Sequence, residues 1–81
     1  MKRDLLERII IDPAIMGGRP VIKGTRIPVD LILRLLAQGT SLEDLIKDYP
    51  HLTKEDISAA LLYGAEVISG EDILDLASLK H

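Results

Sequence analysis

Residues 17–29, with the sequence GGRPVIKGTRIPV, decide how this chain is organised. The stretch combines three glycines, two prolines and three cations between two apolar segments. Glycine permits positive φ angles and close backbone approach, whereas proline fixes φ and favours turns. We therefore expect tight turns beside short extended segments here, followed by a chain that is helical from Pro28 onward.

Two short strands are predicted on either side of this turn-rich region. Residues 8–11 are rich in β-branched side chains, and Asp12-Pro13 ends that run. Residues 20–23 form the second predicted strand, which would pair with the first or with the same strand of a partner chain. Because two strands alone are marginally stable, the rest of the fold must support them. Residues 1–7 predict only a frayed helical turn.

A helical period begins at Pro28, because proline is favoured at helix starts and Asp30 falls in the first turn, where the helix dipole stabilises an anion. The apolar residues of this helix cover most of its circumference, which predicts that it is nearly surrounded by protein. Gly39 follows as the expected C-terminal cap. The next helix is predicted to start at Ser41, whose side chain would cap the backbone at Asp44.

A third helix is predicted to start at Thr53, with the same capping arrangement toward Asp56. The predicted inward face of the second helix consists of Leu42, Leu45, Ile46 and Tyr49. The predicted inward face of the third consists of Ile57, Ala60, Leu61, Gly64, Ala65 and Ile68. The outward face of the third helix would then carry Lys54, Glu55, Ser58, Ala59, Leu62, Tyr63 and Glu66.

The predicted fold class is mainly α, with a short N-terminal β segment followed by a trihelical helix-turn-helix bundle. Residues 1–81 are expected to be a single domain, with the β and turn segment at 8–27, the three helices at 28–68 and a C-terminal tail or short helix at 69–81. Many small three-helix bundles share this outline. Turn length alone therefore does not separate a DNA reader from an interaction module.

Composition limits the function classes. No cysteine is present, which leaves no disulfide or thiolate metal site and suits a reducing cytoplasm. The apolar runs are too short for the roughly 20 residues that span a bilayer, so no membrane segment is expected. The net charge is −3, whereas dedicated nucleic-acid binders usually carry a basic balance or a dense basic face. A chain of this size buries a smaller fraction of its surface on folding than a large one and is marginally stable alone, which favours a homodimer.

Enzyme and cofactor chemistry finds little support in the sequence. His51 and His81 are the side chains that titrate near neutral pH, and neither has a nucleophile motif or a spaced carboxylate pair beside it. The glycines match neither nucleotide-binding pattern. The acidic group Glu71, Asp72 and Asp75 fits a solvated helix face better than a metal site. We therefore expect no enzymatic activity, no metal and no cofactor.

Seven residues are the candidates for contact with nucleic acid or with a protein partner. The three cations of residues 17–29 would clamp phosphate, pair with acidic groups of a partner or solvate a turn, and Arg26 is expected to form an internal ion pair with Asp30. The outward Leu62 and Tyr63 favour a protein interface, because base readout favours Arg, Lys, Asn and Gln. The full candidate set is Arg19, Lys23, Arg26, Lys54, Ser58, Leu62 and Tyr63.

A series of short motifs runs through about residues 8–67. In order they are Ile11-Asp12-Pro13, Gly18-Arg19-Pro20-Val21-Ile22, Gly24-Thr25-Arg26-Ile27-Pro28-Val29, Gly39, Ser41-Leu42-Glu43-Asp44, Tyr49-Pro50 and Leu52-Thr53. This series resembles the bacterial domain-of-unknown-function family numbered 433. The resemblance implies a homeodomain-like helix-turn-helix domain with an N-terminal β segment, often dimeric, in bacteria and archaea. It also implies a VapB-type antitoxin that binds and silences a PIN-like nuclease toxin and autoregulates its own transcription.

Two functions stay open at this point. The first is the antitoxin of a toxin–antitoxin pair, with a PIN-like nuclease as partner and DNA binding as an optional second role. The second is a stand-alone dimeric DNA-binding transcriptional regulator that acts through Arg19, Lys23, Arg26 and Lys54. The amphipathic tail at residues 69–81 would either pack on the bundle or engage the toxin.

Overall fold

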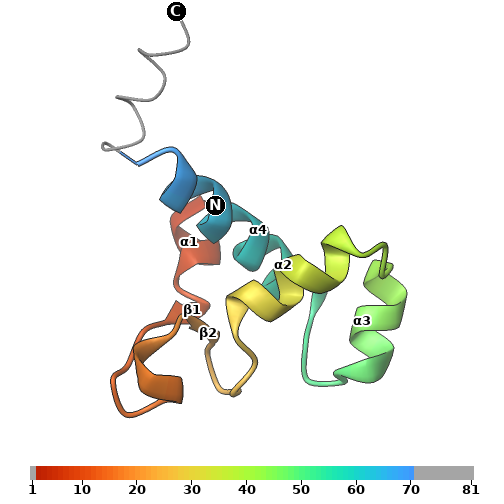
Figure 1. The fold of residues 1–81 in the computed structure, drawn as a ribbon, viewed down its shortest axis with the longest axis horizontal. Helices are drawn as coiled ribbons and strands as arrows, with labels where there is room; N and C mark the ends of the chain where they lie inside the picture. The colour runs from red at the N-terminus through yellow and green to blue at the C-terminus, as the bar shows by residue number, and fades with distance from the viewer. Residues whose placement is uncertain (1, 71–81) are drawn as a thin grey trace, which may run out of the picture.

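The computed structural model describes residues 2–70 of the chain. This part contains four α-helices and a small hairpin. Figure 1 shows α3 at one side of the molecule and the hairpin at the other. The predicted mainly helical fold with a short N-terminal β segment is confirmed. Of the predicted tail at residues 69–81, only Ser69 and Gly70 belong to the described part. The elements are α1 (Lys2–Leu6), β1 (Ile9–Ile10), the 3-10 helix η1 (Met16–Gly18), β2 (Val21–Ile22), α2 (Val29–Ala37), α3 (Leu42–Asp48) and α4 (Lys54–Ile68).

The two strands pair within one chain, which decides between the two pairings that the sequence left open. They run antiparallel, with Ile9 opposite Ile22 and Ile10 opposite Val21. Val21 and Ile22 are buried, so the ladder is held by side-chain packing as well as by its few hydrogen bonds. The strands are shorter than predicted, two residues each.

The Gly-Thr-Arg-Ile-Pro sequence builds the junction between β2 and α2. Gly24 has a φ of 81°, a left-handed conformation that glycine adopts without a Cβ clash. The hydroxyl of Thr25 donates to the carbonyl of Ile22 at 2.7 Å and accepts from the N–H of Ile27 at 3.0 Å. Pro28 follows in extended conformation as the residue that precedes α2. These bonds fix the point at which the chain turns from strand to helix.

The helix α2 ends as predicted at a glycine, because Gly39 has a φ of 97° just beyond its last turn. The expectation that α2 is nearly surrounded is wrong, since Val29 and Ile32 are its only buried residues. The helix packs against α3 and α4 and leaves Arg34 exposed. The core cluster consists of Ile22, Val29, Ile32, Leu45, Leu52, Ile57 and Ala60.

Both predicted helix caps are present. The hydroxyl of Ser41 accepts the N–H of Asp44 at 3.1 Å, and the hydroxyl of Thr53 accepts the N–H of Asp56 at 3.1 Å. The carboxylate of Asp56 also accepts the N–H of Thr53 at 3.1 Å, which completes a capping box at the start of α4. Leu42 was predicted to point inward, but it is 43% exposed, because the buried face of α3 centres on Leu45.

The predicted inward face of α4 is wrong in part. Ile57 and Ala60 are buried as expected, whereas Leu61, Ala65 and Ile68 are exposed. Ala59 was expected to face outward, yet it has no exposed surface. The reason is α1, which forms a helix rather than a frayed turn and packs against α4 (Figure 1).

The helix α4 is therefore covered on two sides, by α2 and α3 on one and by α1 and β1 on the other. An ion pair ties the second side together: Arg8 Nη1 lies 3.0 Å from Asp56 Oδ1. The Asp56 side chain is 9% exposed, and its two oxygens serve the capping box and Arg8 respectively. Nothing in residues 2–70 forms a helix long and apolar enough to cross a membrane.

Candidate partner-binding surface

One face of α4 is left open to solvent, and it is apolar over most of its length. Leu61 is 49% exposed and Ile68 is 66% exposed, with Ala65 between them. We call the exposed residues of this face the solvent face of α4: Lys54, Ser58, Leu61, Ala65 and Ile68. They are separated by four, three, four and three positions, a spacing that keeps side chains on one side of a helix.

Of the four candidate residues that belong to α4, two lie on this face and two do not. Lys54 and Ser58 are exposed as predicted. Leu62 and Tyr63 are half-buried, and Tyr63 packs against the core cluster, so both are less exposed than predicted. Their contact with a partner stays a prediction. The four-three spacing from Lys54 onward is visible in the sequence and marks one side of the helix. Which side faces solvent depends on the packing of α1 against α4, which the sequence did not indicate.

The predicted ion pair between Arg26 and Asp30 is also wrong, because Arg19 takes that role. Arg19 Nη2 lies 2.6 Å and 2.8 Å from the two carboxylate oxygens of Asp30, and Arg34 Nε lies 3.5 Å from one of them. The hydrogen bond from Arg19, aided by Arg34, holds the pKa of Asp30 below its ordinary value. The pair ties the segment before β2 to the first turn of α2. The charge of Arg19 is thereby engaged within the chain.

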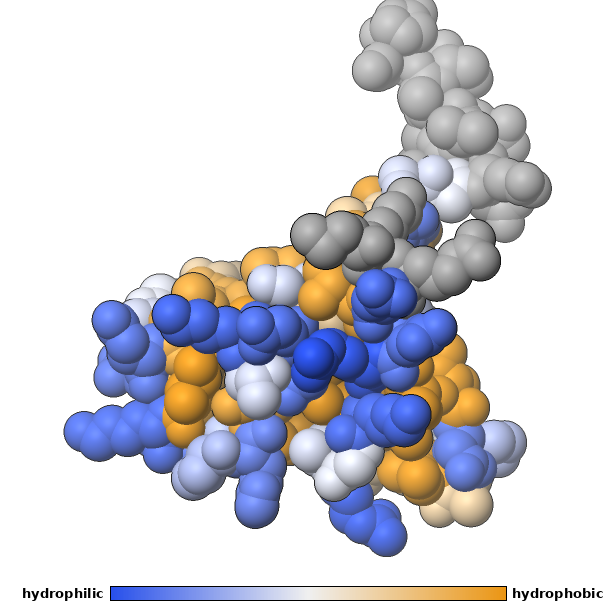
Figure 2. Space-filling model, turned by 180° about the vertical axis from the view of Figure 1, so that it is seen from behind, coloured by the Kyte–Doolittle hydropathy of each residue, from blue (hydrophilic) through white to orange (hydrophobic). Residues whose placement is uncertain are grey.

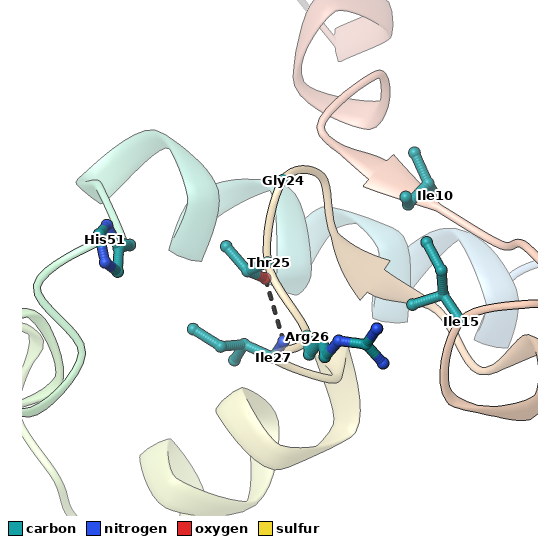
Figure 3. Close-up of a pocket in the computed structure, with 7 residues that line it drawn as sticks. All are labelled: Ile10, Ile15, Gly24, Thr25, Arg26, Ile27 and His51. Atoms are coloured by element: carbon teal, nitrogen blue, oxygen red, sulfur yellow. Dashed lines mark hydrogen bonds between the residues drawn. The ribbon is translucent and has the colours of Figure 1, made fainter.

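Lys23 and Arg26 are exposed, and neither makes an ion pair with any residue among 2–70. Arg26 borders an open hollow of about 520 Å³ beside the hairpin. Figure 3 shows Ile10 and Ile15 on one side of this hollow, His51 on the other and the Gly24 turn between them. The hollow is mainly apolar, and its lining residues are Ile10, Ile15, Gly24, Thr25, Arg26, Ile27 and His51.

Sequence reasoning missed this hollow because its walls come from segments far apart in the chain. His51 lies between α3 and α4, where it is exposed, and it also lines the hollow. Ile10 and Ile15 are half-buried rather than covered. The hollow combines an apolar wall with a cationic guanidinium. That chemistry suits an apolar side chain of a partner with a carboxylate beside it.

Acidic and basic side chains lie close together at several places on the described surface. Figure 2 shows polar residues gathered across the middle of the rear face, with apolar ones between and around them. A separate polar depression mixes three acids with two cations; it is lined by Asp4, Glu7, Arg8, Lys23 and Asp56. Within residues 2–70 no cluster of three or more His, Cys, Asp or Glu side chains is placed to hold a metal ion. The acidic group Glu71, Asp72 and Asp75 lies outside the described residues.

Comparison with known proteins finds relatives of the same small domain. An uncharacterized protein, y4eO, from Sinorhizobium fredii is 39% identical over 57 residues, which are 70% of this chain and 26% of that protein. The chain therefore spans about a quarter of the length of that relative. An uncharacterized protein from Archaeoglobus fulgidus is 57% identical over 30 residues, 37% of this chain and 83% of that protein.

A solved structure shares the fold. The crystal structure of a DUF433 member protein from Anabaena variabilis superimposes with a TM-score of 0.67 at 34% identity, covering 94% of this chain and 73% of that one. The family model described as a protein of unknown function, DUF433, matches residues 9–64. This range contains the hairpin, the Gly-Thr-Arg-Ile-Pro junction and most of α4. The chain belongs to the DUF433 family.

Proposed function

We propose that this protein is the non-enzymatic antitoxin of a toxin–antitoxin pair and that it binds a PIN-like nuclease toxin through the solvent face of α4. The observation that carries the proposal is that this face exposes Leu61 and Ile68 to water although the core of the fold is complete without them. Exposed aliphatic side chains gathered on one face are a usual feature of protein interfaces. The resemblance to VapB-type antitoxins supplies the class of partner.

The same face is poorly suited to reading DNA. In a helix-turn-helix domain α4 would be the recognition helix, and its exposed side chains would contact base edges and phosphates. Base readout relies on Arg, Lys, Asn and Gln, and Lys54 is the one side chain of these types on the solvent face. Burying the exposed half of Leu61 and of Ile68 against a protein contributes about 1 kcal/mol each. The same side chains placed against the polar groove of a DNA duplex would not gain this free energy.

The hollow beside the hairpin offers a second contact. One of its lining residues, His51, lies three residues before Lys54, and we infer that a partner seated along the solvent face could also reach Arg26. An acidic side chain of the toxin would pair there with a guanidinium that has no ion-pair partner among residues 2–70. Autoregulatory DNA binding and a homodimer remain part of the proposal as predictions from sequence.

A second candidate function is a dimeric DNA-binding regulator. It is favoured by one specific observation: Lys23, Arg26 and Lys54 are exposed, and none of them makes an ion pair within the described residues. Arg19 contributes less than predicted, because Asp30 already neutralises it. Three free cations would give a weak and strongly salt-dependent complex with DNA.

Co-purification separates the two functions. The tagged protein is recovered from its own cells at two salt concentrations, with and without nuclease treatment, and the retained proteins are identified by mass spectrometry. The antitoxin proposal expects a PIN-like protein in stoichiometric amount in every sample. It also expects that the wild-type protein suppresses RNA cleavage by that partner when the two are mixed.

The regulator predicts a different pattern. Nucleic acid would be retained only without nuclease, and it would be lost steeply as salt rises, because phosphate contacts release counterions. Recovery of the protein alone, or with DNA as its only ligand, would contradict the antitoxin proposal. Retention of a PIN-like protein whose RNA cleavage is unaffected would contradict it as well.

A further inference from the structure

We propose that the hollow beside the hairpin binds a small amphipathic carboxylate, a molecule with an aliphatic body and one carboxylate group. The inference goes beyond the proposed function and does not depend on the identity of a toxin. The volume of the hollow, about 520 Å³, lies within the range of roughly 300–1,000 Å³ that is usual for small-molecule sites. A molecule bound there would take the place of the toxin's acidic side chain that we propose beside Arg26.

The apolar walls of the hollow offer surface that the core of the fold does not use. Ile9 and Ile10 are neighbours in β1, and successive side chains of a strand point to opposite faces. Ile9 packs against the core cluster, so Ile10 faces the other way and lines the hollow. Ile15 lines it too, and within residues 2–70 it belongs neither to the core cluster nor to the apolar side chains packed against that cluster. Both lining isoleucines are half-buried, and an aliphatic ligand would cover their remaining surface.

Arg26 supplies the charge that would hold the carboxylate. Its side chain is exposed and makes no ion pair with any residue among 2–70. Figure 3 shows this side chain extending from the turn toward the side on which Ile10 and Ile15 lie. A guanidinium donates paired hydrogen bonds to the two oxygens of a carboxylate, and these bonds are stronger than those between uncharged groups. A carboxylate bound by Arg26 would therefore place its aliphatic body against the two isoleucines.

The other polar groups of the hollow favour a ligand with a single anionic group. The hydroxyl of Thr25 already donates to one backbone carbonyl and accepts from one backbone N–H. His51 lies on the opposite side of the Gly24 turn (Figure 3). Arg26 is thus the one permanent cation among the described lining residues. A sugar or a nucleotide would bury several polar groups against apolar walls without partners, which costs free energy.

Titration of the full chain with straight-chain carboxylates, followed by amide chemical shifts, tests the site. Butyrate, hexanoate and octanoate are the probes, and shifts are expected at Ile10, Ile15 and Thr25. Affinity should rise by up to about fourfold for each added methylene until the hollow is filled, because each methylene removes apolar surface from water. Octanamide has a similar aliphatic body without the charge, and it should bind at least about tenfold more weakly than octanoate.

Variants separate the charge from the apolar wall. Arg26→Gln should abolish the preference for octanoate over octanamide. The matched control is Lys23→Gln, which removes an exposed cation of the same segment that does not line the hollow, and this variant should keep the preference. Ile15→Ala should weaken both probes alike, because it shortens the apolar wall. Absence of saturable shifts in the hollow would overturn the proposal, and so would equal effects of Arg26→Gln and Lys23→Gln.

Two further outcomes would identify a different mode of binding. Octanoate shifts centred on Leu61 and Ile68 would show adsorption to the solvent face of α4 and contradict binding in the hollow. A short peptide with adjacent leucine and glutamate residues is titrated in parallel. Shifts in the hollow with this peptide but with none of the free carboxylates would assign the hollow to a protein segment and contradict a small-molecule ligand. No toxin is present in these titrations, so their failure leaves the proposed role of the solvent face unchanged.

Discussion

The two sides of α4 differ in how closely the fold specifies them. On the buried side Ile57 and Ala60 sit in the core, and Gly64 leaves just enough room for Leu33. On the solvent face Leu61 and Ile68 are as apolar as the core residues, yet nothing in the described part of the chain covers them. The buried side is therefore explained by folding alone. The solvent face carries more apolar surface than the fold uses, which is the physical basis for assigning it to a partner.

The largest expected contrast is between truncations on the two sides. Ile57→Ala removes a side chain that is 1% exposed, and it should lower the free energy of unfolding by about 3 kcal/mol through lost burial and a residual cavity. Leu61→Ala should cost less than about 1 kcal/mol, because half of that side chain is already in water. Urea unfolding of both variants measures the difference. Equal losses would mean that the solvent face is part of the core.

Asp56 and Asp30 each accept a hydrogen bond from an arginine, and we expect their removal to change the free energy of unfolding by different amounts. Asp56→Ala removes both the capping bond to Thr53 and the partner of Arg8, and it should cost about 2 kcal/mol. Asp30→Ala breaks a pair whose side chains are 50% and 45% exposed, so it should cost less than about 1 kcal/mol. Thermal or urea unfolding checks the order. A larger loss for Asp30→Ala would show that the exposed pair, rather than the buried one, secures the N-terminal segment.

A small pH effect follows from Asp30. Its pKa is lowered in the folded chain, chiefly by the hydrogen bond from Arg19, so the stabilisation is present above the unfolded pKa of about 3.9 and is lost as the pH falls through the folded value. Asp30→Asn should therefore flatten the acid side of the stability–pH curve relative to wild type, while the curves stay parallel near neutrality. Identical acid slopes for the two proteins would contradict this role of the Arg19 pair.

Local signals in the sequence predicted the elements well. Thr53 with Asp56 marks the start of α4, and Gly39 marks the end of α2, because capping depends on residues within one turn. The Gly-Thr-Arg-Ile-Pro junction was likewise recognisable as a turn, since Gly24 and the Thr25 hydroxyl act on neighbouring backbone groups. These features needed no knowledge of the rest of the fold.

Long-range packing decided what the sequence left unpredicted. The faces of α4 were misassigned because α1 covers a second side of that helix, which buries Ala59 and leaves Leu61 exposed. The partner of Asp30 was misassigned because Arg19, eleven residues earlier in the chain and before strand β2, forms the bond. The hollow beside the hairpin joins segments separated by about half the chain, so no local pattern indicated it. The candidate site was thus predictable in chemistry, as an apolar helix face with nearby cations, but not in position.

Two matched leucines test the role of the solvent face most directly. Leu61 is 49% exposed on α4 and Leu42 is 43% exposed on α3, so an aspartate at either position changes an exposed aliphatic side chain in the same way. The dissociation constant of the complex with the proposed PIN-like nuclease partner is measured for wild type, Leu61→Asp and Leu42→Asp. We predict at least about tenfold weaker binding for Leu61→Asp, equivalent to about 1.4 kcal/mol, and wild-type binding for Leu42→Asp. Unchanged binding of Leu61→Asp, or equal weakening of both variants, would contradict the assignment of the solvent face as the partner-binding surface.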